Sequence, residues 1–176
     1  MAYGLRPNSV RPTLLLLLIR HGDAGSRDET KWPDDTERPL TKQGDRQTAK
    51  MAKRLRRRGY IPTVLLSSPW VRAWQTAEVV AQEFEDEGLM PEACEALATM
   101  PRVERFAEAI GTPGDEAIIA LVGHEPWLGE LASRLLTSST SKLQIEFPKS
   151  GVIGIELEAV ESGAGRLVFF WRPKGE

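Results

Sequence analysis

The two histidines of the chain each stand at the end of a short apolar run, next to a glycine. His21 follows the apolar residues 13–19 and Arg20, and His124 follows residues 117–123. A neutral imidazole acts as a base, a nucleophile or a metal ligand near neutral pH. Since the chain has no other histidine, this repeated placement favours one shared functional site over two unrelated structural residues.

Both apolar runs are typical of strands buried on both faces in the middle of a parallel sheet. A buried helix would be equally apolar, but the short length of the first run and the glycine that ends it favour a strand. In open α/β sheets, ligands bind beyond the carboxyl ends of the strands. Both histidines are therefore expected where a ligand would lie, with the polar segment 23–38 at the border of the site.

Helical and extended patterns alternate along the rest of the chain. Helices are predicted from Thr41, as N-cap, to Gly59, from Ser68-Pro69 to Phe84, and over residues 103–110 and 128–136. Further strands are predicted over residues 62–67, 94–97, 143–147, 152–159 and 166–171. This alternation predicts an α/β protein, a three-layer α/β/α sandwich with a mostly parallel central sheet and an antiparallel C-terminal edge hairpin.

Length and composition indicate one soluble domain, over residues 13–173, preceded by a flexible N-terminal arm over residues 1–12. The net charge of -2 argues against broad nucleic-acid binding. Cys94 is the only cysteine, which excludes an intrachain disulfide and favours a reducing compartment. The first apolar run is too short to span a membrane. A cytoplasmic protein without a membrane partner is therefore expected, and its oligomeric state stays open.

Two arginines accompany the histidines. Arg20 precedes His21, and Arg72 falls in the first turn of the helix that begins near Ser68, where free backbone N–H groups favour an anion. Arginine binds phosphate through paired hydrogen bonds. The sequence therefore predicts a dianion site, most simply for phosphate. Ser68 is expected either to donate to that phosphate or to cap its helix.

Attack of a histidine nitrogen on phosphorus would give a phosphohistidine that water hydrolyses, while the second histidine stabilises the transferring phosphoryl group. A metal site is the alternative role. It is disfavoured because no His-x-x-x-His, paired cysteines or clustered Asp and His supply further ligands. Neither a metal nor another cofactor is expected.

Four motifs occur in order: RHGDA, RPLTKQG, SPWVRAWQTA and GHEPWLG, beginning at Arg20, Arg38, Ser68 and Gly123. Together they resemble the signature of the histidine phosphatase superfamily, and most of all the small SixA-type phosphohistidine phosphatases. The resemblance implies a phosphoglycerate-mutase-like sandwich with His21 as the phosphorylated nucleophile. It also implies that Arg20, Arg72 and His124 complete the phosphate pocket.

The chain departs from mutase-like members at several positions. Arg27 stands where they carry a phosphate-binding asparagine, the glutamate that serves them as proton donor has no clear counterpart, and no insertion is large enough for a substrate cap. Glu125 is the first candidate donor, although it could cap a helix instead. Asp23 is a weaker candidate, which could instead hold Arg20. A phosphohistidine substrate would need no strong acid.

The function expected from the sequence is a metal-independent phosphatase that hydrolyses a phosphomonoester or phosphohistidine, on a phosphorylated protein. A small-molecule (sugar-phosphate) phosphatase or a phosphomutase is the alternative among enzymes. A phosphate-recognising regulatory module without turnover is the alternative of another class.

Overall fold

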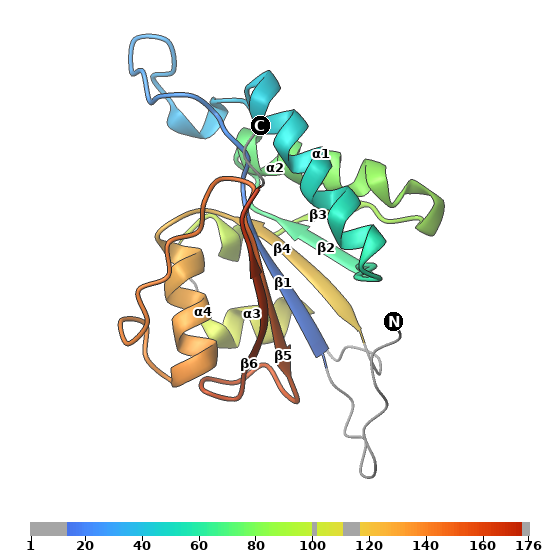
Figure 1. Cartoon of the computed structure of the whole chain (residues 1–176). Coiled ribbons are helices and arrows are strands. Elements are labelled where there is room, and N and C mark those ends of the chain that lie inside the picture. The colour runs from blue at the N-terminus through green and yellow to red at the C-terminus, as the bar shows by residue number, and fades with distance from the viewer. Residues whose placement is uncertain (1–13, 100–101, 111–116, 174–176) are drawn as a thin grey trace.

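A six-stranded sheet with helices on both faces forms the framework of the protein (Figure 1). The computed structural model describes residues 14–99, 102–110 and 117–173, so the expected N-terminal arm lies outside the described residues. The strand order is β3-β2-β4-β1-β5-β6. The strands are β1 (Leu14–Arg20), β2 (Val64–Ser67), β3 (Pro91–Ala93), β4 (Ile118–Gly123), β5 (Val152–Leu157) and β6 (Arg166–Trp171).

Strand β1 lies in the interior of the sheet, between β4 and β5. It pairs in parallel with β4 and antiparallel with β5. Leu16 and Leu18 join one core cluster, and Leu17 and Ile19 join the other. Because successive side chains of a strand point to opposite faces, β1 needs apolar residues at every position, which explains its uninterrupted run of leucines.

Two helices cover each face of the sheet. Helices α1 (Lys42–Arg57) and α2 (Val71–Glu83) pack on one face, and α3 (Val103–Ile110) and α4 (Trp127–Thr137) pack on the other (Figure 1). The β1/β4, β2/β4 and β2/β3 pairs are parallel, whereas β5 and β6 form an antiparallel hairpin at the edge. The predicted three-layer sandwich is therefore confirmed.

The helix limits follow from local chemistry. Thr41 is the N-cap of α1, as predicted, and its hydroxyl accepts a hydrogen bond from the Gly44 N–H at 3.0 Å. Helix α2 begins later than predicted, because its N-cap is Trp70 and not Ser68. Within the described ranges, no helix combines the length and apolar character that crossing a membrane requires.

Two predicted strands are wrong. Residues 94–97 are preceded by the short strand β3 and then form a 3₁₀ turn, Glu95–Leu97, that buries Leu97. Residues 143–147 form no strand. Phe147 is buried in the core, but its backbone bonds to side chains, since Phe147 O accepts from Arg20 and Phe147 N donates to Glu125. Because the N–H and the C=O of Phe147 already have hydrogen-bond partners, this residue needs no neighbouring strand.

Candidate active site

The two histidines meet at the carboxyl ends of the parallel strands β1 and β4. Arg20 at the end of β1 lies in register with Gly123 at the end of β4, so the next residue of each strand is a histidine. The ring centroids of His21 and His124 are 5.1 Å apart. Their exposed fractions are 7% and 3%, so both rings are almost fully removed from water.

Hydrogen bonds fix the tautomer of His21. Its Nδ1 lies 2.7 Å from Gly22 O, and a carbonyl oxygen can only accept, so Nδ1 carries the proton. Its Nε2 lies 3.3 Å from the Nε–H of Arg72, which can only donate. Nε2 therefore holds the free electron pair. Burial and the guanidinium groups of Arg72 and Arg20 lower the pKa of His21 to about 3, so the ring is neutral at pH 7.

Arg72 is held by contacts along its whole length. Its carbonyl accepts from the Thr76 hydroxyl at 2.7 Å, and that hydroxyl accepts in turn from the Gly22 N–H at 3.0 Å. The guanidinium lies 4.7 Å from the Trp70 ring centre. Burial lowers the pKa of Arg72, although Asp35 opposes the shift. The side chain is thus fixed beside His21, in the first turn of α2.

His124 and Arg20 complete the cluster. His124 Nε2 and the Ser68 hydroxyl are 2.9 Å apart, and Arg20 donates one guanidinium N–H to Phe147 O at 2.6 Å. Within the described part of the chain, Arg20 Nε and His124 Nδ1 are buried without a hydrogen-bond partner. Burial and the neighbouring His21 lower the pKa of His124 to about 2. An oxyanion placed here would give Arg20 Nε the acceptor that it lacks.

Ser68 lies in the site but does not cap α2. Its hydroxyl contacts His124, and the same oxygen accepts a hydrogen bond from the Trp70 N–H at 3.3 Å. The helix begins only after Trp70, which forms no side-chain cap. The expectation that Ser68 caps the helix is therefore wrong, and its hydroxyl instead contacts the imidazole of His124.

Asp35 and Arg38 belong to the site but were not predicted. The Asp35 carboxylate accepts from Arg38 Nε at 2.8 Å and lies 3.1 Å from an Arg72 nitrogen, while Asp35 O accepts from Arg72 at 2.6 Å. The hydrogen bond from Arg38 lowers the pKa of Asp35. Arg38 also donates to Ala24 O and Gly25 O, at 3.0 and 3.1 Å. Asp35 therefore links the loop after β1 to Arg72.

Glu125 does not cap α4. The N-cap of that helix is Pro126, and the Glu125 carboxylate accepts instead from the Phe147 N–H at 3.2 Å. Burial raises the pKa of Glu125, against the opposing effects of the Phe147 hydrogen bond and of Arg20. Since Arg20 bonds to the carbonyl of the same Phe147, Glu125 and Arg20 hold one backbone segment from both sides.

Asp23 does not hold Arg20. Its carboxylate contacts the Lys149 ammonium and accepts from the Thr41 hydroxyl at 2.8 Å. Burial raises the pKa of Asp23, but the hydrogen bonds from Lys149 and Thr41 outweigh that effect and hold it below its usual value. Asp23 thus fixes the start of α1 and is ionised at neutral pH, which suits a proton donor poorly.

Arg27 stands apart from the buried cluster. Its side chain is 66% exposed and lies 3.7 Å from Glu29. Ser150 lies next to His21, because its N–H donates to His21 O at 3.2 Å, and its hydroxyl lies 3.0 Å from the Thr48 hydroxyl. Across the described ranges, no three His, Cys, Asp or Glu side chains are grouped as metal ligands.

Comparison with known proteins gives a consistent result. Residues 16–100 match the family model of the histidine phosphatase superfamily (branch 1). An uncharacterized protein of Picosynechococcus is 33% identical over 154 residues, which are 86% of this chain and 87% of that protein. The region that matches the family model contains Arg20, His21 and Arg72, three residues of the cluster.

Two further relatives carry the name SixA. Phosphohistidine phosphatase SixA of Escherichia coli is 27% identical over 163 residues, covering 89% of this chain and 91% of SixA. The structure of the protein histidine phosphatase SixA complexed with tungstate superposes with a TM-score of 0.71 and 26% identity, over 90% of this chain and 97% of that one. The α/β/α sandwich is thus the fold of these phosphatases.

Proposed function

The chain belongs to the histidine phosphatase superfamily and is a SixA-like phosphatase, and on this premise we propose that it acts through a phosphohistidine formed at His21. One observation carries the proposal: the unprotonated Nε2 of His21 lies 3.3 Å from a buried guanidinium, beside a second buried imidazole. A neutral nitrogen nucleophile next to fixed cations is what attack on a phosphoryl dianion requires.

The phosphoryl group would bind among Arg20, Arg72 and His124. His21 Nε2 attacks phosphorus, a P–N bond forms, and the bond from phosphorus to the leaving group breaks with its electron pair. The cations stabilise the charge that spreads over the three equatorial oxygens. Water then attacks the phosphohistidine, which releases inorganic phosphate and restores the free electron pair of His21.

Glu125 is the proposed proton donor for leaving groups that need one. Its raised pKa keeps part of it protonated at higher pH than an ordinary carboxyl, and it lies in the field of Arg20. If this role is correct, Glu125→Gln slows the hydrolysis of an alkyl phosphate much more than that of a 4-nitrophenyl ester, which leaves without help. Equal losses for both would assign Glu125 to positioning the Phe147 segment.

A phosphorylated protein is the proposed substrate, and phosphohistidine the proposed phosphorylated residue. The likeness to SixA supports this, as does the sequence, which has no insertion large enough for a cap over the site. A phosphohistidine leaves as imidazole, so this substrate also places the smallest demand on Glu125 as an acid.

A phosphate-release screen with and without EDTA tests the proposal. Its substrates are a phosphohistidine protein, phosphoserine and phosphotyrosine peptides, sugar phosphates and an aryl phosphate. Turnover is expected to survive EDTA and to be lost in His21→Ala, while Arg27→Ala, at an exposed arginine, retains it. Loss of turnover with EDTA, or its survival in His21→Ala, would refute the mechanism. Binding of phosphopeptides without release would identify a regulatory module.

A further inference from the structure

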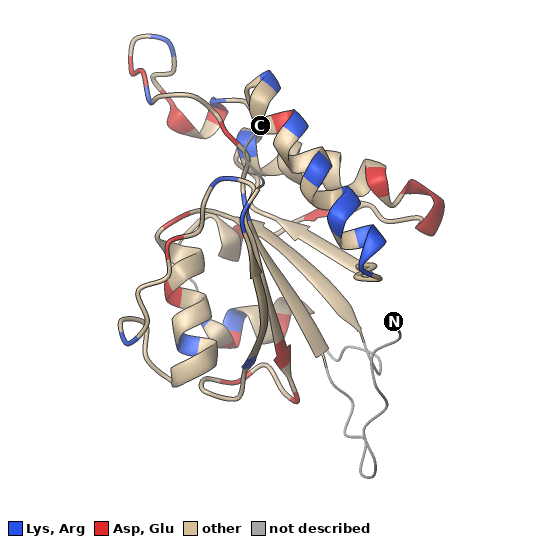
Figure 2. Cartoon of the chain, viewed as in Figure 1, with Lys and Arg blue, Asp and Glu red and all other residues tan. Residues whose placement is uncertain are grey.

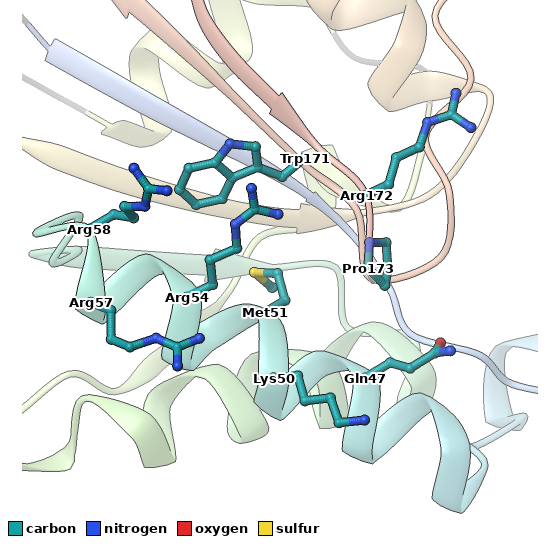
Figure 3. A pocket seen from close by; sticks show the side chains of 9 residues that line it. All are labelled: Gln47, Lys50, Met51, Arg54, Arg57, Arg58, Trp171, Arg172 and Pro173. Atoms are coloured by element: carbon teal, nitrogen blue, oxygen red, sulfur yellow. The ribbon is translucent and has the colours of Figure 1, made fainter. Parts of the chain in front are cut away.

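A cavity lies away from the histidines, between one side of α1 and the end of β6. Figure 3 shows the side chains that surround it. Its volume is about 430 Å³, within the range of ligand-binding clefts. We call this cavity the α1–β6 groove. Its cations are Lys50, Arg54, Arg57, Arg58 and Arg172, and none of the Asp or Glu residues that the structure describes lines it.

Ion pairing differs between this side of α1 and the side that faces α2. Arg56, which points toward α2, lies within 3.6 Å of Glu83 and also pairs with Asp86. By contrast, Arg54, Arg57 and Arg58 have no ion pair in the part of the chain that the structure describes. Figure 2 shows this concentration of positive charge along α1. The fold thus pairs Arg56 on the side that faces α2, and it leaves the guanidinium groups of Arg54, Arg57 and Arg58 without a carboxylate partner among the described residues.

Aromatic stacking fixes one of these cations. The Arg54 guanidinium lies 4.1 Å from the Trp171 ring centre, and Phe169 stacks on the same indole with ring centroids 4.1 Å apart at 23°. Both groups cannot share one face of a ring at that distance, so they occupy opposite faces. The indole therefore has no face left for a nucleobase. Recognition in the groove must rest on charge.

The cations that α1 contributes to the groove are arranged in a row along the helix and are not gathered around one spot. Lys50, Arg54, Arg57 and Arg58 recur at the spacing of one face of a helix, which extends over about 12 Å from first to last. Such a row matches several successive carboxylates of an extended chain better than it matches one compact anion. The net charge of -2 for the whole chain disfavours a long nucleic acid, which needs a broad positive surface.

The groove also begins close to the site. Gln47 lines one end of it, and the next residue, Thr48, contacts the hydroxyl of Ser150. The N–H of Ser150 donates to His21 O. The Gln47 end of the groove is therefore connected to His21 through two contacts in the interior of the protein.

We propose that the α1–β6 groove binds an acidic segment of the phosphoprotein substrate. This inference rests on the proposed function and adds to it a preference for substrates with clustered Asp and Glu near the phosphorylated residue. The matched variants are Arg54→Gln/Arg57→Gln/Arg58→Gln in the groove and Lys42→Gln/Arg46→Gln/Lys53→Gln elsewhere on α1, with the same change in charge.

The substrates are two phosphohistidine peptides, one flanked by glutamates on both sides and one by glutamines. We expect the wild type to prefer the acidic peptide by about tenfold in kcat/KM, in low salt, and the groove variant to lose that preference. The control variant should keep it, and hydrolysis of an aryl phosphate should be equal in all three. No preference in the wild type, or equal loss in both variants, would overturn the inference.

Binding of the unphosphorylated acidic peptide, followed by fluorescence anisotropy, separates this inference from the proposed function. Groove-dependent binding without any phosphate release would refute the function and keep the groove. Turnover of both peptides without groove-dependent binding would support the proposed function and refute the role of the groove. A DNA duplex that binds tighter than the acidic peptide, and depends on the same arginines, would show a nucleic-acid surface and refute the proposal.

Discussion

Mild acid should destabilise this protein through its two buried histidines. The pKa of His21 is lowered to about 3 and that of His124 to about 2, whereas an unfolded histidine titrates near 6.5. The native state therefore binds fewer protons than the unfolded state between these values. The contribution of the two histidines to the free energy of unfolding is fully present above about pH 6.5, and it falls as the pH drops toward the native pKa values.

The size of the effect follows from linkage. Each histidine costs about 1.4 kcal/mol per pH unit once the pH is well below 6.5. Lowering the pH from 6.5 to about 4.5 thus reduces the free energy of unfolding by about 2 kcal/mol for each histidine, and by about 4 kcal/mol for both. With exposed fractions of 7% and 3%, neither ring is screened by solvent. The loss is a large part of the stability of an ordinary domain.

Urea unfolding of the wild type, His21→Asn and His124→Gln between about pH 6.5 and 4.5 measures this. Each variant should lose the contribution of one histidine to the pH dependence of the free energy of unfolding. Carboxylates that titrate in the same range are common to all three proteins, so they do not affect the difference between them. The buffers must contain no phosphate, since a bound oxyanion would change both pKa values. Identical pH dependence in all three would mean that the imidazoles already protonate in the native state, and the assignment of a neutral nucleophile would fail.

Three other changes have defined outcomes. Asp35→Asn removes the carboxylate that orients Arg72 and Arg38, and should lower kcat/KM about tenfold with little loss of thermal stability; an unchanged kcat/KM would contradict this role. Gly44→Ala should destabilise by about 1 to 3 kcal/mol despite the higher helix propensity of alanine, because its Cβ would lie 2.2 Å from Asp23 O. The exposed Gln43→Ala is its control in thermal unfolding. Phe84→Ala, at a fully buried ring, should cost about 3 to 5 kcal/mol by urea unfolding, and a loss below 1 kcal/mol would contradict its place in the core.

The elements that depend on local signals were predictable from the sequence. The apolar runs that became β1 and β4, and the Thr41 cap of α1, have physical signatures that lie within a few consecutive residues. Because β1 and β4 are parallel neighbours, the placement of both histidines after them was enough to predict that the rings would meet.

Contacts between distant segments could not be predicted in the same way. Residues 143–147 have a pattern suited to a strand, yet Arg20 and Glu125 satisfy the backbone of Phe147 from elsewhere in the chain. Asp35 gave only a weak signal, its spacing of three residues from Arg38 in a loop expected to border the site. Nothing in that spacing indicates that the loop folds back onto Arg72.

The loop between β1 and α1 has a consequence for how this scaffold can change. Neither core cluster contains a residue between positions 20 and 50, and the loop is held by polar contacts such as those of Asp23, Asp35 and Arg38. Extra residues inserted between Arg27 and Trp32, where the side chains are exposed or half-exposed, would leave the packed interior intact. Lengthening this one loop is therefore a route by which selection, or an engineer, can enclose the two buried histidines and narrow the range of substrates without rebuilding the sandwich.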